Sequence, residues 1–517
     1  MENFLSFVAE YNGVINTFVW TTIGLVLLIG TGILTTTLTK FFQVTRLGHW
    51  MKQTLGSLFS KGSHTKDEKS ISPFQALCTA LAATIGVGNI AGVAAAICAG
   101  GPGAVFWMWV AAFFGMMTNY SENVLGIYYR RRNDKGEWSG GAMYYLKDGL
   151  GSRPETKWIG RIDAVLCSCF TLLASFGIGS MGQVNKIVVN LESAFDIPVL
   201  SGIELYSGVS LYSVIIGVLL VVLATLIVFG GLKRIAAVAE RIVPFMVILF
   251  IAGSLVIIGV NYANILPALK AIFVTAFKPS SIAGGAVGIT VKAAMVAGFK
   301  RGVFSNEAGL GSSVMVHSNS SIEEPVKQGM WGIFEVFADT MVVCTMTALT
   351  VLTSGVYNLE TGTATGSDAT LVANAFDSVF GFGGIGSKFI AIAILLFAFT
   401  TVLGWSHYGS KAWEYLFGTK SVPAYKAIHI ATIMLGALLT SSLAWDISDT
   451  FNGLMMIPNL IGVICLSGLV MKITNNYIDR KIKGKQVKPM LSAFEDIQNE
   501  EEAELIAEEV SETVTTK

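Results

Sequence analysis

An apolar stretch near the start of the chain, residues 72–109, is long enough to cross a membrane but is interrupted at its centre by glycine and polar residues. It reads SPFQALCTALAATIGVGNIAGVAAAICAGGPGAVFWMW. In hydrocarbon, a central polar side chain such as that of Asn89 must find a partner inside the protein. Gly86 and Gly88 let the backbone leave helical angles. We therefore expect a broken helix whose freed amides and carbonyls face a cavity.

A broken helix of this kind predicts half of a binding site. The N-terminus of its second half attracts an anionic group, and its unwound carbonyls suit a small cation, as in secondary transporters. Close helix packing through Gly88 and Gly92 is the alternative, because small residues four positions apart let membrane helices approach. Thr84 and Asn89, together with a second interrupted segment far along the chain, favour the binding site.

The composition indicates an all-α integral membrane protein. Hydrophobic residues make up 53% of the 517 residues and charged residues only 14%, whereas soluble domains carry about 25% charged residues. The six cysteines all fall in apolar segments, which argues against a disulfide framework and against a zinc site. The formal net charge is zero, so overall charge names no partner; for a membrane protein we expect membrane lipid, and not nucleic acid, as a partner. Apolar segments of about 20 residues predict eleven transmembrane helices. The interrupted stretch is the second, and the others are at 14–38, 103–129, 162–191, 211–229, 236–260, 284–313, 329–352, 389–413, 427–445 and 451–471.

Basic residues gather in alternate loops and predict how these helices are oriented. They are present in the loops 40–69, 130–157, 233–234, 420–426 and 472–485, and absent from 100–102, 192–210 and 447–450. The positive-inside rule then puts the N-terminus outside and the C-terminus in the cytoplasm. Lys292, Lys300 and Arg301 lie within the seventh predicted helix, so they either line a water-filled pathway or show that its limits are misplaced.

The seventh predicted helix is also interrupted, because its middle, 302–312, is rich in glycine and polar residues. The two interruptions fall in the second and seventh helices, which begin two consecutive sets of five. Since five helices invert topology, this placement predicts a 5+5 inverted repeat with the binding site where the broken helices meet. The predicted divisions are an extra N-terminal helix with a cytoplasmic linker (1–71), the two repeats (72–260 and 261–472) and a cytoplasmic tail (473–517).

Four motifs in the chain resemble the alanine/glycine:cation symporter family of prokaryotes. They are GVGNIAG (86–92), GGPGAVFWMWVAAFFG (100–115), GGAMYYL (140–146) and RGVFSNEAGLG (301–311). The resemblance implies the leucine-transporter fold with one extra N-terminal helix, and a multi-pass protein of the prokaryotic plasma membrane. It also implies uptake of small neutral amino acids, alanine and/or glycine, with sodium (Na+) as the coupled ion.

The same resemblance implies which residues hold the substrate and the ion. Those expected around the substrate are Thr84, Gly88, Asn89, Gln183, Phe304, Ser305, Thr401 and Trp405. Those expected around sodium are the carbonyl groups of Ala82, Ile85 and Phe397 and the hydroxyl groups of Thr400 and Thr401. Trp405 follows Thr401 by one helical turn and so faces the same cavity. A second sodium site would use Asn89 and Ser305, with a further ligand from the eighth helix that the sequence leaves unplaced.

These residues also have structural alternatives. Thr400 and Thr401 could bond back to carbonyls of their own helix. Gln183 could join two helices, and Phe304 and Trp405 could be packing aromatics.

Several charged residues within the predicted helices are candidates because ionisable groups in membranes mark functional sites. Structural pairing is favoured for Glu122, while Glu335 and Asp339 stay open. Glu307, in the second break, is expected to act in gating, with Arg301 as its partner.

The competing functions are a proton-coupled transporter or exchanger of the same fold and, in a different class, an intramembrane enzyme that also buries carboxylates. The sequence contains no HExxH motif, no GxSxG motif and no Walker A sequence. Neither hydrolysis nor ATP-driven pumping within this chain is therefore supported.

Overall fold

The computed structural model describes residues 2–59, 70–206, 208–278, 290–381, 384–439 and 443–515, which are helical in most of their length. Up to the first break the helices are α1 Glu2–Phe18, α2 Gly24–Leu38, α3 Phe42–Thr45, α4 Leu47–Gln53 and α5 Pro73–Thr84. They continue as α6 Val93–Gly100, α7 Gly103–Tyr128, α8 Ala142–Asp148, α9 Lys157–Phe176, α10 Gly182–Ala194, α11 Pro198–Ser201, α12 Leu211–Val228, α13 Gly231–Val260 and α14 Ile265–Thr275. The remaining helices are α15 Val291–Asn306, α16 Val314–His317, α17 Pro325–Val336, α18 Thr345–Thr353, α19 Asp368–Phe380, α20 Ile385–Phe417, α21 Val422–Leu438, α22 Leu443–Tyr477 and α23 Glu495–Thr515.

Short non-α elements connect these helices. The described strands form two antiparallel pairs, β1 Arg131–Arg132 with β2 Trp138–Ser139, and β3 Glu204–Tyr206 with β4 Val209–Ser210. Single π-helical segments interrupt or extend several helices at Val19–Ile23, Gly88–Gly92, Gly177–Met181, Phe337–Cys344 and Ile478–Ile482. Such segments widen one helical turn and are frequent at functional sites.

Eight continuous helical runs within the described residues are long and apolar enough to cross a membrane. They are Ser6–Leu38, Lys157–Ala194, Leu211–Val228, Gly231–Val260, Pro325–Thr353, Ile385–Phe417, Thr419–Leu438 and Asp446–Ile482. A ninth candidate is the pair Pro73–Thr84 and Gly88–Gly100, which is bent by 56° at its break. The predicted interruption of the second helix is thus confirmed, whereas the predicted total of eleven helices and their repeat stay a prediction.

Two predicted helix limits differ from the structure. The predicted tenth helix runs to residue 445, but α21 ends at Leu438 because Leu439 is extended (φ −74°, ψ 126°), and Trp445 belongs to α22. The predicted start of the seventh helix, residue 284, lies outside the described residues. The described helix there, α15, begins after Thr290, whose side chain caps it by accepting a hydrogen bond from the Ala293 amide.

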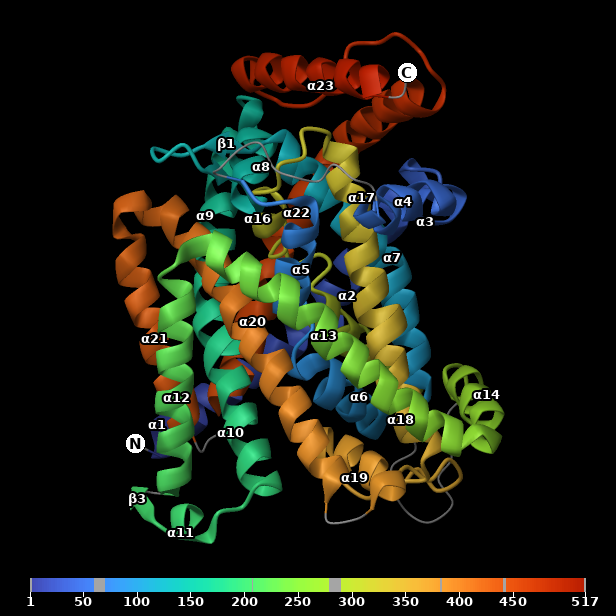
Figure 1. The fold of residues 1–517 in the computed structure, drawn as a ribbon, viewed down its shortest axis with the longest axis vertical. Coiled ribbons are helices and arrows are strands. Elements are labelled where there is room, and N and C mark those ends of the chain that lie inside the picture. Colours follow the sequence, from blue (N-terminus) through green and yellow to red (C-terminus); the bar gives the residue numbers. More distant parts are fainter. Residues whose placement is uncertain are drawn as a thin grey trace.

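Figure 1 shows the C-terminal helix α23 across one end of the molecule, near α8 and β1, with α11, α14 and α19 at the opposite end. Arg130, two residues after α7, joins α23 to the body of the protein. Its guanidinium donates to Glu501 Oε1 of α23 (2.7 Å) and to the carbonyls of Ser320 (2.6 Å) and Ile322 (2.8 Å). Both side chains of this ion pair are 2% exposed, and Trp138 stacks on the guanidinium at 4.0 Å. The tail is therefore tied to the segment that follows α16.

Candidate functional site

The first break lies between α5 and α6. Helix α5 is capped by Ser72, which forms a capping box with Gln75, and it ends at Thr84 because Ile85 leaves the helical region (φ −76°, ψ 87°). Asn89 bridges the break, since its Oδ1 accepts a hydrogen bond from the Gly86 amide at 2.9 Å. The central asparagine therefore satisfies a backbone group that the broken helix leaves free.

The second break starts later than the predicted segment 302–312. Helix α15 continues to Asn306, and the chain turns at Glu307, which has a left-handed φ of 56°. Gly302 serves packing instead: a Cβ at this position would lie 3.3 Å from the Ala111 side chain of α7. Phe304 and Ser305 are consequently placed in the last turn of α15, which packs against both the π-helical turn Gly88–Gly92 and α6. The two broken elements therefore lie side by side.

A small cavity, the inner cavity, lies where the two breaks meet. Its volume is about 10 Å³, roughly the space of one water molecule. The lining residues are Ala83, Thr84, Gly86, Gly88, Ile178, Gln183, Phe304, Glu307, Thr401, Trp405 and Asn452. The structure thus gathers six of the eight residues expected around the substrate at one place; the other two, Asn89 and Ser305, meet each other in an adjacent cluster.

Two elements that the sequence did not connect with the site also contribute lining residues. Ile178 comes from the π-helical turn Gly177–Met181, and Asn452 from α22. The sequence held a signal for both. Gly177-Ile178-Gly179 is a third glycine-rich interruption of an apolar segment, and Asn452 is a polar residue inside the last one. Glu307 was expected in gating, and the structure puts it in the wall of the cavity.

Gln183 and Thr401 approach the first break from two other helices. The Val87 amide donates to Gln183 Oε1 at 3.4 Å, and Gln183 Nε2 donates to the Ile178 carbonyl at 3.1 Å. A Cβ on Gly86 would lie 2.6 Å from Thr401 Oγ1, so only glycine admits the hydroxyl this closely. Both side chains therefore bring oxygen atoms to the unwound backbone.

The oxygen atoms proposed for sodium lie on α5 and α20. Thr400 Oγ1 donates to the Leu396 and Phe397 carbonyls at 3.0 and 2.9 Å, and Thr401 Oγ1 to the Phe397 carbonyl at 3.0 Å. Helix α20 packs closely on α5 at Gly404, where an added Cβ would lie only 2.6 Å from the Ala83 side chain. The expected ligand carbonyls flank this contact, since Ala82 lies in the last turn of α5 and Ile85 is the residue that follows the helix.

A second polar cluster is centred on Asp339, which is fully buried in the π-helical segment Phe337–Cys344. Asn89 Nδ2 donates to its Oδ1 at 2.6 Å, while Ser305 Oγ and Thr340 Oγ1 donate to its Oδ2 at 2.8 and 2.7 Å. Cys344 lies beside Asn89 and Ser305, at 3.5 and 3.2 Å. Asp339 thus joins the two breaks, because it accepts hydrogen bonds from Asn89 of the first and from Ser305 of the helix that leads into the second.

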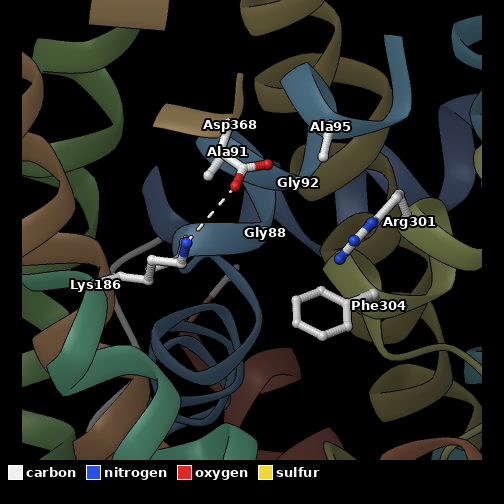
Figure 2. A pocket seen from close by; sticks show the side chains of 9 residues that line it. Gly88, Ala91, Gly92, Ala95, Lys186, Arg301, Phe304 and Asp368 are labelled. Atoms are coloured by element: carbon white, nitrogen blue, oxygen red, sulfur yellow. Dashed lines mark ion pairs between the residues drawn. The ribbon is translucent and has the colours of Figure 1, made fainter. Parts of the chain in front are cut away.

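An outer pocket of about 50 Å³ lies on the far side of Phe304. Lys186 and Asp368 form an ion pair of 3.7 Å at this pocket. Figure 2 shows the pair on one side of the pocket and Arg301 and Phe304 on the other. The Arg301 guanidinium lies 5.7 Å from the Phe304 ring centroid. The expected Arg301 partner, Glu307, instead bonds to residues lining or flanking the inner cavity. Phe304 lines both spaces, and its ring would touch a Cβ on Gly88 at 3.1 Å.

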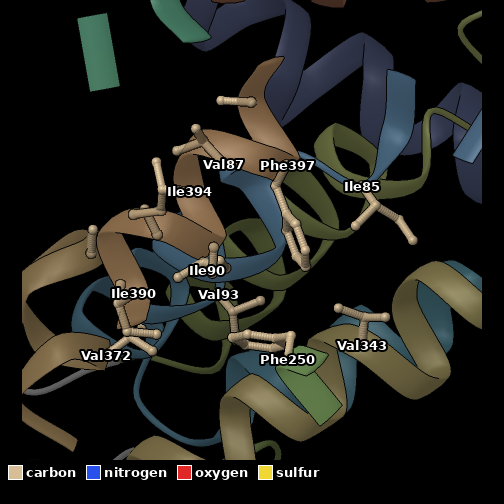
Figure 3. Close-up of a cluster of buried hydrophobic side chains, with 14 of the residues drawn as sticks. Ile85, Val87, Ile90, Val93, Phe250, Val343, Val372, Ile390, Ile394 and Phe397 are labelled. Atoms are coloured by element: carbon tan, nitrogen blue, oxygen red, sulfur yellow. The ribbon is translucent and has the colours of Figure 1, made fainter. Parts of the chain in front are cut away.

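An apolar wall supports the first break from behind. Ile85, Val87, Ile90 and Val93 are at most 2% exposed, and Figure 3 shows them packed among side chains of α13, α19 and α20. This burial on one face leaves the other face of the break for the cavity.

Two other buried carboxylates fix the segment after the second break. Glu122 Oε1 accepts hydrogen bonds from the Gly311 amide at 3.2 Å and from the Asn459 side chain. Glu335 Oε2 contacts His317 Nε2 at 2.9 Å and accepts from Asn119 Nδ2 at 3.2 Å. Within the described residues, no three or more His, Cys, Asp or Glu side chains gather as a metal-binding group.

The comparisons with known proteins agree with this arrangement. The sequence model of the sodium:alanine symporter family matches residues 5–491. The chain is 42% identical over 473 residues to the sodium/alanine symporter AgcS of Methanococcus maripaludis, an alignment that covers 92% of this chain and 98% of that protein. It is 36% identical over 477 residues to the probable sodium/glutamine symporter GlnT of Bacillus subtilis, covering 92% and 91% of the two chains. The fold is similar to that of the crystal structure of MhsT in complex with L-phenylalanine, with a TM-score of 0.52 at 13% identity over 79% of this chain and 99% of that one.

Proposed function

This chain belongs to the sodium:alanine symporter family, and from that premise we propose that it takes up small neutral amino acids, alanine and/or glycine, together with sodium. Its family and its fold are those of membrane transporters. One observation carries the proposal: the ends of two broken helices and Thr401 of α20 line the same small cavity.

The cavity suits the two charges of an amino acid. The second half of the first broken helix presents its N-terminal end there, at Gly88, and attracts a carboxylate. The first half of the second broken helix, α15, presents its C-terminal end at Glu307 and attracts an ammonium group. Since the relatives are named for both alanine and glutamine, size decides between them. Because the bulky Trp405 indole lines this cavity, we expect room beside it for a hydrogen or methyl side chain.

Sodium is proposed to bind between α5 and α20, where the carbonyls of Ala82, Ile85 and Phe397 and the hydroxyls of Thr400 and Thr401 supply oxygen ligands. Unwound carbonyls and hydroxyls of this kind hold sodium in broken-helix transporters. Asp339, with Asn89 and Ser305, is proposed as a second cation site, because a buried carboxylate beside neutral oxygens favours a positive charge.

Transport is proposed to proceed by alternating access through a 5+5 inverted repeat with one extra N-terminal helix. The N-terminus would lie outside and the C-terminus in the cytoplasm of a prokaryotic cell. In this orientation the outer pocket of Lys186, Arg301 and Asp368 opens to the outside, and α23 lies on the cytoplasmic side.

The test is uptake of labelled alanine by the purified full chain in liposomes, with sodium and proton gradients imposed separately. We expect accumulation with an inward sodium gradient and none with the proton gradient alone. Accumulation driven by protons in the absence of sodium would identify the proton-coupled alternative. Equal uptake with and without any gradient would overturn the proposal of symport.

A further inference from the structure

Trp405 and Glu307 form a direct contact across the inner cavity. The indole Nε1 of Trp405, on α20, donates to Glu307 Oε1 at 2.9 Å, and Ser312 Oγ donates to Glu307 Oε2 at 2.5 Å. Trp405 is 2% exposed and Glu307 is 4% exposed. A hydrogen bond between two buried side chains is stronger than one in water, because the surrounding protein is a medium of low dielectric. This bond therefore fixes the direction in which the indole points.

The other sides of the indole are packed. A Cβ on Gly179 would lie 2.5 Å from Trp405 Cβ and Cγ, so the base of the side chain rests on glycine backbone. The Tyr408 ring meets the indole edge-on, with centroids 5.4 Å apart at 67°. The hydrogen bond to Glu307 is thus the restraint that comes from the second broken helix, whereas the packing restraints come from α20 itself and the turn Gly177–Met181.

We propose that Glu307 is a positioning residue that holds the Trp405 indole across the cavity and thereby sets the upper size of the substrate side chain. The inference rests on the proposed function, because it assumes that Trp405 borders the side chain of a small amino acid. It assigns the size limit to a carboxylate at the end of α15 and not to the bulk of the tryptophan alone. Without the bond, the indole can turn about its side-chain torsions and leave room for a branched side chain.

A direct role of Glu307 as the partner of the substrate ammonium makes a different prediction. In Glu307→Gln the amide oxygen still accepts from the indole, and the amide nitrogen can still donate to the Ser312 hydroxyl. The positioning role therefore survives this change, whereas an ion pair to an ammonium group does not. Glu307→Ala removes both roles.

The experiment uses the full chain in liposomes, with alanine, valine and leucine competing against labelled alanine. In Glu307→Ala we expect the preference for alanine over valine to fall about tenfold, because the two extra carbon atoms of valine then find buried space at about 0.8 kcal/mol each. Trp405→Phe, which keeps a ring but loses the indole N–H, should shift the order in the same direction. Glu307→Gln should retain the order of alanine over valine, whatever its absolute affinity. The matched control is Trp413→Phe on the same helix, which loses an indole bond to Ser421 at the far end of α20 and should leave the order unchanged.

The proposal is overturned by a common fall of all three affinities in Glu307→Ala, or by loss of the alanine preference in Glu307→Gln. Thermal unfolding of the wild type, both single variants and Glu307→Ala/Trp405→Phe needs no substrate. The losses of stability in the two single variants should be coupled, so that the double variant loses less stability than their sum. Additive losses would remove the bond from the argument. Absence of alanine uptake by the wild type would instead refute the proposed function. The unfolding measurements on the four proteins would still test the bond between Glu307 and Trp405.

Discussion

At the scale of single residues, Thr400 and Thr401 test the proposed sodium site most directly. Thr400→Val and Thr401→Ala each remove one hydroxyl but leave the helix carbonyls in place. We expect each variant to raise the sodium concentration needed for half-maximal uptake, and the double variant to be nearly inactive, because the shell competes with water for the ion. Sodium titration of alanine uptake in well-expressed protein measures this. Normal sodium dependence of the double variant would remove both residues from the site.

Asn89 makes two hydrogen bonds at the first break, and one substitution distinguishes a role in binding from a role in packing. Asn89→Ala frees the Gly86 amide and takes one donor from Asp339. We expect alanine binding to weaken by about 1.5–3 kcal/mol, the range for hydrogen bonds to charged groups. Equilibrium binding of labelled alanine is the measurement, with Asn261→Ala, at the end of α13, as the control. Unchanged affinity would assign Asn89 to packing.

The sequence can reveal a polar residue in an apolar segment, but it cannot reveal which distant residue becomes its partner. Asn89 and Thr84 stand out because polar groups in an apolar run need partners. Asp339 was recognised as a candidate, but its partnership with Asn89 and Ser305 joins positions 250 and 34 residues away, which only the packed fold brings together. The contact of Glu307 with Trp405, 98 residues apart, is hidden for the same reason.

At the scale of helices, the close approach of α20 to α5 carries a prediction of its own. A Cβ on Gly404 would meet Ala83 Cα and N at 2.9 and 3.0 Å, and backbone cannot move aside cheaply. Gly404→Ala should therefore destabilise the protein by about 1–3 kcal/mol, as overpacking does, and should weaken sodium binding because Thr401 moves with it. Thermal unfolding and sodium titration measure the two effects.

The control for this change is Gly468→Ala in α22, where a Cβ meets nothing within 4 Å. Alanine is the better helix former there, so stability should be equal or higher. If Gly404→Ala behaved like Gly468→Ala in both assays, the contact between α20 and α5 would not position the sodium ligands.

The helices also show why one break was located well and the other less so. Between residues 72 and 109 the polar and glycine residues coincide with the place where α5 ends. In the second case Gly302 and its neighbours are small because α15 packs closely on α7, and the helix passes through them to Asn306. Glycine marks both unwinding and close approach, and sequence alone does not separate the two.

At the scale of the whole molecule, the proposed symport moves net charge. A zwitterion that travels with one sodium ion carries one positive charge, so about 100 mV, negative inside, contributes roughly 2.3 kcal/mol. A tenfold sodium ratio adds about 1.4 kcal/mol, and together they support accumulation of about a few hundredfold. Liposomes with an imposed potassium diffusion potential should show this rise, and choline in place of sodium should abolish it. Accumulation that ignores the potential would exclude net charge movement.

The docking of α23 should depend on pH through Glu501. Burial raises the pKa of this carboxyl to about 7, against the opposing effect of the Arg130 guanidinium and with smaller contributions from Glu323 and Glu504. A carboxyl with a higher pKa when docked holds its proton more tightly there. The contribution to docking is therefore complete below the pKa of a free glutamate, about 4.3, and is lost as the pH rises to about 7.

We accordingly expect hydrogen exchange in α23 to increase, beyond its intrinsic pH dependence, between about pH 5 and pH 7 and then to level off. Glu501→Gln should remove this change, while Glu500→Gln, which alters the exposed neighbour that pairs with Arg132, should keep it. A pH response that persists in Glu501→Gln would place its origin in another group.

The position of Phe304 has a consequence for the speed of the two half-reactions. Its ring borders both the inner cavity and the outer pocket, and aromatic side chains reorient on short timescales when little else must follow. On the opposite side, residues 307–320 are fastened by Glu122, Glu335 and Arg130, so release in that direction requires collective rearrangement, which takes microseconds to milliseconds. In the proposed orientation, external substrate should therefore bind and leave many times before one molecule is delivered inward, and inward release should limit turnover.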